Sequence, residues 1–266
     1  MDLDGTLLND EKEISWGNQT AVDQALEEGH KMVIATGRSL SSALIQARRL
    51  GLTKDGCYVI AFNGGEIYDP FRNRSLYRRT IPRELVTQVF EDAHRRKIQI
   101  QTFADTEVLT EEDRPELHDY VMRTLQSFRI VPSVASVMEK DPCKILAIEE
   151  VRRDVIVQFR ADLLEKYDGV LDCYFSNDSY LEIVPAGVTK GNAVRWMCDF
   201  LKIPIENSVA AGDAPNDIDM LEAAYVGAAM KNAYSGVKEH GDYVTKSDNN
   251  HDGVAEIINR FVLKRT

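Results

Sequence analysis

The feature that most restricts the fold of this chain is an alternation of short apolar segments with segments of helical spacing. Two stretches of the sequence show it, one on each side of a long central segment. The predicted strands cover residues 32–35, 58–62, 209–211 and 226–230, and the predicted helices cover residues 15–28, 39–50, 191–201 and a segment that begins at 216. Strands that alternate with helices in this way predict a doubly wound parallel sheet with helices on both faces.

The pattern changes over residues 82–185. Predicted helices at 83–96, 114–127 and 154–167 are mixed with predicted strands at 98–103, 144–148, 170–175 and 180–184. The last two strands are joined by a short polar turn, which is typical of a hairpin, so this segment predicts an α+β module with a largely antiparallel sheet. We therefore expect residues 1–81 and 186–266 to form one α/β core, interrupted by an inserted domain of roughly 100 residues.

Composition narrows the possible partners. The chain has 44% hydrophobic and 28% charged residues, as an ordinary soluble globular protein does. Its net charge of −11 argues against nucleic acid or an anionic membrane as the main partner. The four cysteines lack paired metal-ligand spacing, and neither an apolar run of membrane-spanning length nor a signal peptide is evident. We expect a cytoplasmic protein with reduced thiols, and the oligomeric state stays open.

Two acidic residues at the start of the chain carry most of the functional information. Asp2 and Asp4 are one residue apart, so at the end of a strand their side chains point to the same side. Two carboxylates held together need a cation or a shared proton, and a hard divalent ion such as Mg²⁺ suits oxygen ligands. Gly5 and Thr6 follow and form a turn whose backbone N–H groups can face an anion.

Three later segments add complementary chemistry. Thr36 and Gly37 follow an apolar strand, Lys190 stands where a helix begins, and residues 212–217 (Gly-Asp-Ala-Pro-Asn-Asp) end another strand. Strand ends and helix starts are where open α/β sheets bind ligands. The four segments together provide a nucleophile, a hydroxyl donor, a cation and further metal ligands, which is the equipment for transferring a phosphoryl group.

In this order the four segments resemble the four motifs of the haloacid dehalogenase superfamily, and specifically of its Cof-type sugar-phosphatase branch. The resemblance covers nearly the whole chain, as far as residues 245–247 and 252–255. It implies a Rossmann-like core, and a type IIB cap inserted between the Thr36 and Lys190 motifs that closes on the substrate and excludes water. It also implies a Mg²⁺-dependent phosphatase that hydrolyses small phosphorylated metabolites, foremost sugar phosphates, through an aspartyl-phosphate intermediate.

The resemblance also implies a role for each motif residue. Asp2 would be the nucleophile and Asp4 the general acid and base. The metal ligands would be Asp2, Asp4 through its backbone carbonyl, Asp213, and Asp217, either through a water molecule or as a partner that supports the ligands. The phosphate contacts would come from the Leu3 backbone N–H, Thr36, Gly37, Lys190 and the Asn216 amide. Asp219 is expected to be a solvated surface acid.

Two other functions compete with this one. A phosphomutase of the phosphomannomutase kind needs a second cationic phosphate site in the cap, and five arginines there are scattered: Arg123, Arg129, Arg152, Arg153 and Arg160. A non-catalytic sugar-phosphate sensor or regulatory scaffold has no need of a nucleophile. For substrate selection the cap offers Lys144, Tyr180 and Glu182, although Glu182 can equally be a hinge residue paired with a base.

One departure from the family pattern concerns the first strand. Relatives have several apolar residues before the first Asp, and these form the central strand of the sheet, whereas only Met1 precedes Asp2 here. We therefore expect a truncated or misassigned start. Without that strand, its two neighbours would leave buried backbone groups unpaired, at a cost of about 1–3 kcal/mol each.

Overall fold

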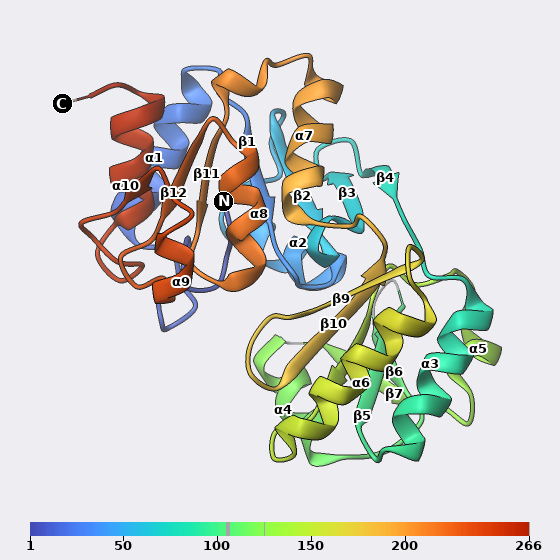
Figure 1. Cartoon of the computed structure of the whole chain (residues 1–266). Coiled ribbons are helices and arrows are strands. Elements are labelled where there is room, and N and C mark those ends of the chain that lie inside the picture. The colour runs from blue at the N-terminus through green and yellow to red at the C-terminus, as the bar shows by residue number, and fades with distance from the viewer. Residues whose placement is uncertain (105–106, 125, 266) are drawn as a thin grey trace. The chain divides into compact units, whose positions relative to one another are not determined.

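The structure is a computed structural model that describes residues 1–104, 107–124 and 126–265, and the chain forms two compact units (Figure 1). The first unit comprises Met1–Gly37, Ala43–Leu76 and Thr189–Thr266, and the second comprises Arg38–Ser42 and Tyr77–Val188. The segment expected as an insertion, residues 82–185, lies within the second unit. Its role as a separate cap domain stays a prediction.

The first unit contains parallel strands, as the alternation predicts. One sheet has the order β1 (Met32–Ala35), β2 (Cys57–Ala61), β3 (Glu66–Asp69), β4 (Arg74–Arg78), and the other has the order β11 (Val209–Gly212), β12 (Val226–Ala229), β13 (Tyr243–Val244). β1 pairs with β2 in parallel, and β11, β12 and β13 are parallel throughout. The antiparallel hairpin of β3 on β2 was not predicted.

The N-terminal residues lie between these two sheets. The amino group of Met1 donates to the Val33 carbonyl at 2.9 Å, and the Ala35 N–H donates to the Met1 carbonyl at 2.8 Å. On the other side, the Asp2 N–H donates to the Ala211 carbonyl at 2.9 Å. These three bonds connect β1 to β11 and place Asp2 at the carboxyl ends of both strands.

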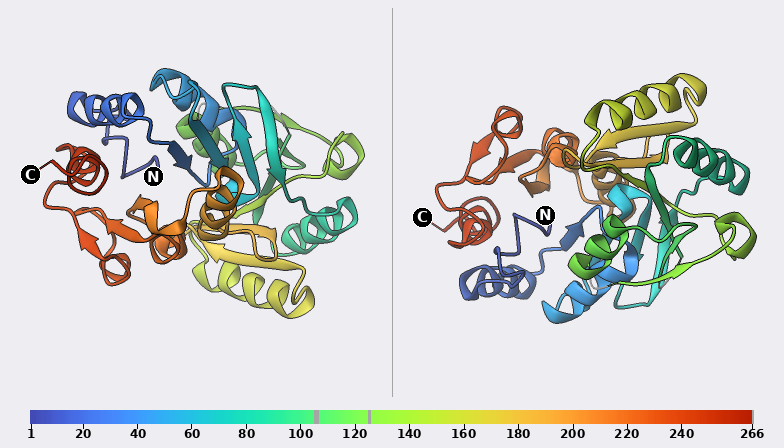
Figure 2. Two further views of the ribbon diagram at one scale, coloured as in Figure 1. Left: turned by 90° about the horizontal axis from the view of Figure 1, so that it is seen from above. Right: turned by 90° about the horizontal axis from the view of Figure 1, so that it is seen from below.

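Helices flank these strands on both sides. They are α1 (Trp16–Glu27), α2 (Leu40–Arg49), α7 (Lys190–Leu201), α8 (Ile218–Ala223), α9 (Ser235–Lys238) and α10 (Gly253–Ile257). α1 and α2 lie on one side of the strands and α7 and α8 on the other, with α10 beside α1 (Figure 2). Ser15 caps α1, because its Oγ accepts the Asn18 N–H at 3.2 Å. The doubly wound α/β core is therefore confirmed.

The second unit has one six-stranded sheet. Its order is β7 (Ser127–Ile130), β6 (Glu107–Thr110), β5 (Gln99–Phe103), β8 (Ile145–Ile148), β10 (Tyr180–Pro185), β9 (Leu171–Phe175). Every neighbouring pair is antiparallel except β6 with β7. The predicted α+β character is confirmed. The predicted helix over 114–127 was too long, because α4 (Pro115–Thr124) gives way to β7, and β6 lies where the sequence indicated a charged loop.

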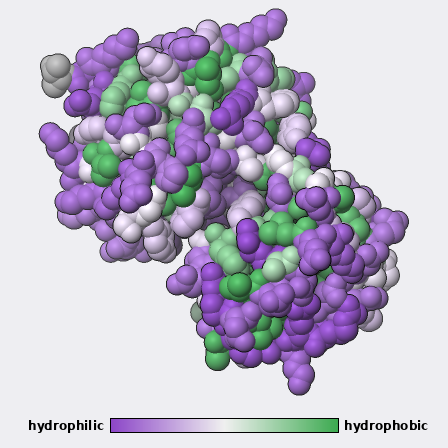
Figure 3. Space-filling model, viewed as in Figure 1, coloured by the Kyte–Doolittle hydropathy of each residue, from purple (hydrophilic) through white to green (hydrophobic). Residues whose placement is uncertain are grey.

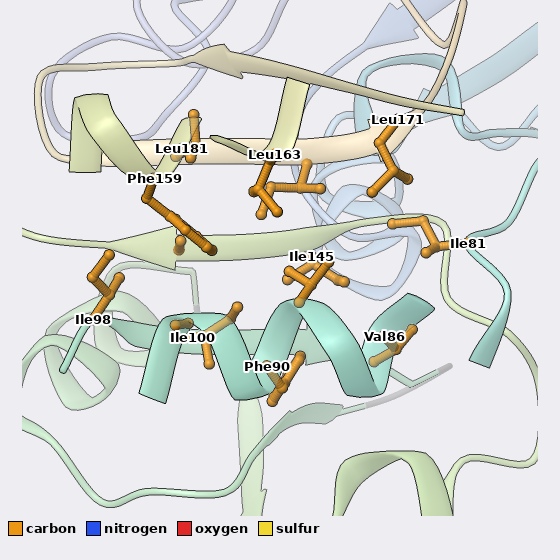
Figure 4. Packing of buried hydrophobic residues seen from close by; sticks show 14 of the residues in the cluster. Ile81, Val86, Phe90, Ile98, Ile100, Ile145, Phe159, Leu163, Leu171 and Leu181 are labelled. Atoms are coloured by element: carbon orange, nitrogen blue, oxygen red, sulfur yellow. The ribbon is translucent and has the colours of Figure 1, made fainter. Parts of the chain in front are cut away.

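Helices α3 (Arg83–Arg95) and α6 (Arg153–Lys166) pack on this sheet and form the hydrophobic core of the unit together with it. A third helix, α5 (Val134–Val137), is a single turn. Phe90 from α3 and Phe159 from α6 pack with Ile100, Ile145 and other buried side chains of the sheet (Figure 4). Burying a large aromatic or aliphatic side chain contributes roughly 1.5–3 kcal/mol. The buried residues of this core all lie between Ile81 and Ile183.

Hydrophobic residues on the face shown in Figure 3 are scattered among hydrophilic ones. The four cysteines form no disulfide, and Cys57, Cys143 and Cys173 are buried. Among the described residues, no helix combines the length and the apolar character needed to cross a lipid bilayer.

Candidate active site

The first unit brings four chain segments together around one buried lysine. Lys190, the first residue of α7, lies with its Nζ 2.6 Å from Asp2 Oδ1 and 2.6 Å from Asp217 Oδ1. Lys190 is 1% exposed and Asp217 is fully buried. Because Asp2 and Lys190 are 188 positions apart in the sequence, this contact is a product of the fold.

The segment after β11 turns sharply to deliver two of the acids. Asp217 Oδ2 accepts the backbone N–H groups of Asp213 and Ala214, each at 3.1 Å. A glycine is needed at the end of the strand, because a Cβ on Gly212 would lie 2.5 Å from the Cβ of Asp217. The Gly-Asp pair at the end of this strand therefore fixes both carboxylates beside Lys190.

The turn after Asp4 also packs on this cluster. Thr6 Oγ1 donates to Asp213 Oδ1 at 2.8 Å, and both residues are buried. Gly5 has a positive φ of 78°, and a Cβ there would lie 2.4 Å from Asp213 Oδ2. The Asp-Gly-Thr sequence thus serves to hold Asp213 in place, a role that sequence reasoning had not assigned to Thr6.

Burial and crowded charges perturb these groups strongly. Burial raises the pKa of Asp2 to about 8, with Lys190 opposing the shift and Asp217 and Asp213 adding to it. Burial, and then the charge of Asp217, raise the pKa of Asp213 to about 7. Burial alone would lower the pKa of Lys190, but Asp2 and Asp217 raise it above its ordinary value. One lysine therefore does not balance the three carboxylates.

The geometry of the acids fits a cation. Asp2, Asp213 and Asp217 are buried, and one carboxylate oxygen from each lies within 4.8 Å of the others. An all-oxygen set of this kind suits a hard divalent ion, which would also stabilise the ionised carboxylates that burial disfavours.

Asp4 and Leu3 lie at the edge of this cluster. The Asp4 carboxylate pairs with Lys12 at 3.1 Å, and its side chain is 39% exposed. It is not one of the three clustered carboxylates, so any part in metal binding would have to come from its backbone carbonyl, as expected. Leu3 is fully buried, and its carbonyl accepts the Leu8 N–H at 2.9 Å. Lys12 is a contact that the sequence did not indicate.

Thr36 and Gly37 follow β1, next to the N-terminal residues. Thr36 comes directly after Ala35, whose N–H bonds to Met1, so Thr36 and Asp2 lie at the same edge of the strands. The Thr36 carbonyl accepts the Asn63 N–H at 3.0 Å. These positions place a hydroxyl and a backbone N–H ahead of α2, where anions bind readily.

Asn216 makes a contact that sequence reasoning missed. Its Nδ2 donates to Asn63 Oδ1 at 3.0 Å, and Asn63 is buried with a positive φ of 55°. Asn63 therefore links the loop after β2 to the loop that carries Asp213 and Asp217. The signal in the sequence was an asparagine followed by two glycines at the end of an apolar strand.

The expectation that Asp219 is a solvated surface acid was wrong. Asp219 Oδ2 accepts the backbone N–H of Gly191 at 2.9 Å. α8 packs against α7, so the acid in the first turn of α8 meets the N–H groups at the start of α7. Asp219 thus holds the helix end that carries Lys190.

Comparisons with known proteins identify the family of this chain. A family model described as haloacid dehalogenase-like hydrolase matches residues 1–258. The putative phosphatase YxeH of Bacillus subtilis is 30% identical over 269 residues, which cover 100% of this chain and 98% of that protein. A second B. subtilis relative, the 5-amino-6-(5-phospho-D-ribitylamino)uracil phosphatase YcsE, is 32% identical over 99% of this chain and 94% of its own.

A solved structure extends the likeness to the fold. The crystal structure of a haloacid dehalogenase-like hydrolase from Bacteroides thetaiotaomicron superposes with a TM-score of 0.89, at 29% identity, over 97% of each chain. The chain belongs to the haloacid dehalogenase-like hydrolase family, and within it the chain is a phosphatase. The family expected from the four motifs is confirmed.

Proposed function

We propose that this phosphatase is Mg²⁺-dependent and hydrolyses small phosphorylated metabolites, foremost sugar phosphates, through an aspartyl-phosphate on Asp2. The observation that carries the proposal is the buried contact of Lys190 with Asp2 and Asp217, with Asp213 in the same cluster. A purely structural cluster would balance its charges, whereas this one has an excess of carboxylates. The name of the YcsE relative, a phosphatase of a ribityl phosphate, supports a polyol or sugar phosphate as the substrate class.

The reaction divides into two displacements at phosphorus. In the first, an oxygen of the Asp2 carboxylate forms a bond to phosphorus while the bond to the leaving alcohol breaks, and Asp4 gives that alcohol its proton. In the second, Asp4 takes a proton from a water molecule that attacks the same phosphorus, which releases inorganic phosphate and restores Asp2. Splitting the reaction in this way replaces one difficult displacement by two easier ones.

The other residues of the site manage charge. When bound by Asp2, Asp213, Asp217 and the Asp4 carbonyl, Mg²⁺ supplies positive charge that offsets the repulsion between a carboxylate and a phosphate. Lys190 favours the ionised form of Asp2, against the effect of burial, and stabilises the charge that spreads over the phosphoryl oxygens. Contacts to these oxygens would come from Leu3 N–H, Thr36, Gly37 and the Asn216 amide.

We assign substrate selection to residues 82–185, which lie within the second unit, as a type IIB cap. Within it, Glu182 is an unsuitable substrate contact, because it pairs with Lys144 at 2.7 Å and also accepts the Ser176 hydroxyl at 2.9 Å. This supports the alternative that Glu182 pairs with a base. Tyr180 remains a candidate for selection, and it lies beside Arg123.

The contacts of the five cap arginines considered for a second phosphate site support hydrolysis over a phosphomutase reaction. A mutase needs cationic groups that are available to a second phosphate. Each of the five arginines donates to a protein group instead: Arg123 to Tyr180, Arg129 to Glu107, Arg152 to Glu149, Arg153 to the Asp178 carbonyl, and Arg160 to the Cys173 carbonyl.

The test is a Mg²⁺-supplemented phosphatase screen over sugar phosphates, nucleotides, flavin mononucleotide and pyridoxal phosphate. We expect release of inorganic phosphate, fastest with sugar or polyol phosphates, and none after metal is stripped with EDTA. Isomerised product without free phosphate would indicate the mutase. Binding of sugar phosphates without turnover would indicate the sensor.

A further inference from the structure

The loop that follows Asp4 is held by a group of asparagines from the C-terminal part of the chain. We call residues 5–10 the Asp4 loop. Asn232 Nδ2 donates to the Gly5 carbonyl at 2.7 Å, and Asn232 Oδ1 accepts the Asn249 N–H at 3.1 Å. The amide of Asn232 thus bridges the beginning of the Asp4 loop and a second loop, more than 220 positions further along the chain.

The far end of the Asp4 loop is held by the same group. Asn249 is buried, and its Nδ2 donates to the Leu8 carbonyl and to Asp10 Oδ1, both at 3.1 Å. Asn250 Nδ2 donates to Asp10 Oδ2, and Asn250 Oδ1 accepts the Asp10 N–H, again at 3.1 Å each. Both ends of the loop are therefore bonded to residues 232 and 249–250, and these contacts lie entirely within the first unit.

We propose that Asn232 is a positioning residue for the acid–base function of Asp4, an inference that rests on the proposed function. The Gly5 carbonyl belongs to the peptide group that follows Gly5, so a bond to it restrains the backbone rotation of the residue next to Asp4 and, through it, the position of Asp4. Gly5 already adopts a positive φ against Asp213. The bond from Asn232 adds a second restraint on this residue, next to an Asp4 side chain that is itself 39% exposed.

The consequence is selective for steps in which Asp4 moves a proton. An alkyl or sugar alcohol leaves as a poor alkoxide unless it receives a proton, whereas p-nitrophenolate leaves without one. Misplacing an acid by a fraction of an ångström weakens only the first kind of reaction. Hydrolysis of the aspartyl-phosphate needs Asp4 as a base whatever the first leaving group was.

The experiment compares Asn232→Ala with wild type on an alkyl or sugar phosphate and on p-nitrophenyl phosphate. We expect kcat/KM for the alkyl substrate to fall about 10-fold or more. On the aryl substrate kcat/KM should change little, and kcat should fall because the phosphoenzyme persists. Acid-quenched samples should then hold a larger fraction of phosphorylated protein. Asn207→Ala, an exposed asparagine before the opposite end of β11, is the matched control and should behave as wild type.

A second variant distinguishes loss of the hydrogen bond to Gly5 from a general folding defect. Asn232→Asp keeps the oxygen that accepts the Asn249 N–H but cannot donate to the Gly5 carbonyl, so it should show the same leaving-group selectivity. An equal fall of kcat/KM for the alkyl and the aryl substrate overturns the positioning role. An unchanged kcat/KM for the alkyl substrate in both variants overturns it as well. If wild-type protein itself releases no phosphate from any substrate, the proposed function fails, which is a distinct result.

Discussion

Each of the two units buries one lysine against carboxylate, and the two sites are built differently. In the first unit, Lys190 lies 2.6 Å from both Asp2 and Asp217. In the second, Lys144 lies 2.7 Å from Glu182 and over the ring of Phe103, 4.9 Å from its centroid. All the charged groups in both sites are less than a tenth exposed, so burial alone does not distinguish a reactive site from a structural one.

The difference lies in the balance of charge. Lys144 and Glu182 form a one-to-one pair, and Ser176 satisfies a further carboxylate oxygen. Around Lys190 there are three buried carboxylates, because Asp213 joins Asp2 and Asp217. A balanced pair needs no further ion, whereas an uncompensated one must acquire a proton or a cation. We infer that excess buried charge, and not burial, marks the reactive centre.

The largest expected effect separates one acid of each lysine site, Asp2 beside Lys190 and Glu182 beside Lys144. Asp2→Asn should reduce kcat by a factor on the order of 10⁶, because it removes the attacking oxygen. Glu182→Gln should leave kcat of the folded protein close to that of wild type, because it changes a structural pair. Steady-state phosphate release with a sugar phosphate measures both.

Covalent labelling provides the control for that result. Wild-type protein quenched in acid during turnover should carry an acid-stable, hydroxylamine-sensitive phosphate, and Asp2→Asn should carry none. Asp4→Asn should still accept phosphate and then stall before hydrolysis. Retained turnover in Asp2→Asn would remove the distinction between the two sites.

The second prediction compares the replacement of each lysine by methionine. Lys190→Met should lower kcat on the order of 10³-fold, because it removes a positive charge aimed at the transition state. Lys144→Met should leave kcat of the folded fraction nearly unchanged. Circular dichroism, together with active-site titration by the phosphoenzyme burst, would confirm that equal amounts of folded protein are compared. Similar losses of kcat in both variants would contradict the contrast.

The motif residues of this site were predictable because each falls at a strand end or helix start, and such positions converge in a parallel sheet. The contacts of Thr6, Asn63 and Asp219 were not, because each depends on which loops the fold brings together. Asp219 illustrates the limit: helical spacing alone placed it on the surface, whereas packing of α8 on α7 gave it the Gly191 N–H. Similarly, β6 and β7 are only four residues long each, so the sequence indicated a loop and part of a helix.

The third prediction concerns stability. Lys144→Met should lower the free energy of unfolding by about 3–5 kcal/mol, because it leaves the buried charge of Glu182 without a partner. The double variant Lys144→Met/Glu182→Leu should recover most of this loss, since a well-packed apolar pair replaces a buried ion pair at little cost. Urea unfolding of the two variants and of wild type measures the effect. A double variant as unstable as the single one would mean that the pair does more than balance charge.

The smallest expected effect is a pH dependence that belongs to the first unit alone. In metal-free protein the pKa values of Asp2 and Asp213 are raised to about 8 and about 7 from 3.8. The folded state therefore binds more protons than the unfolded state between these limits, and stability falls as pH rises through this window. Burial also lowers the pKa of the Met1 amino group from 8.0 to about 6, so this group binds fewer protons in the folded state and offsets part of the loss. The net loss between pH 7 and 8 is therefore only about 0.4 kcal/mol. Urea unfolding in EDTA at the two pH values measures it.

Mg²⁺ should reverse this trend, because cation binding requires the deprotonated carboxylates and so strengthens as pH rises. Stabilisation by a fixed Mg²⁺ concentration should therefore be greater at pH 8 than at pH 7. Asp213→Asn, which removes one of the two titrating groups, should reduce both the pH slope in EDTA and the Mg²⁺ effect. Lys144→Met, whose altered pair lies in the other unit, should retain both. A pH slope in EDTA that is the same in Asp213→Asn as in wild type would show that the carboxylates are already balanced without a cation, and the contrast between the two lysine sites would then be lost.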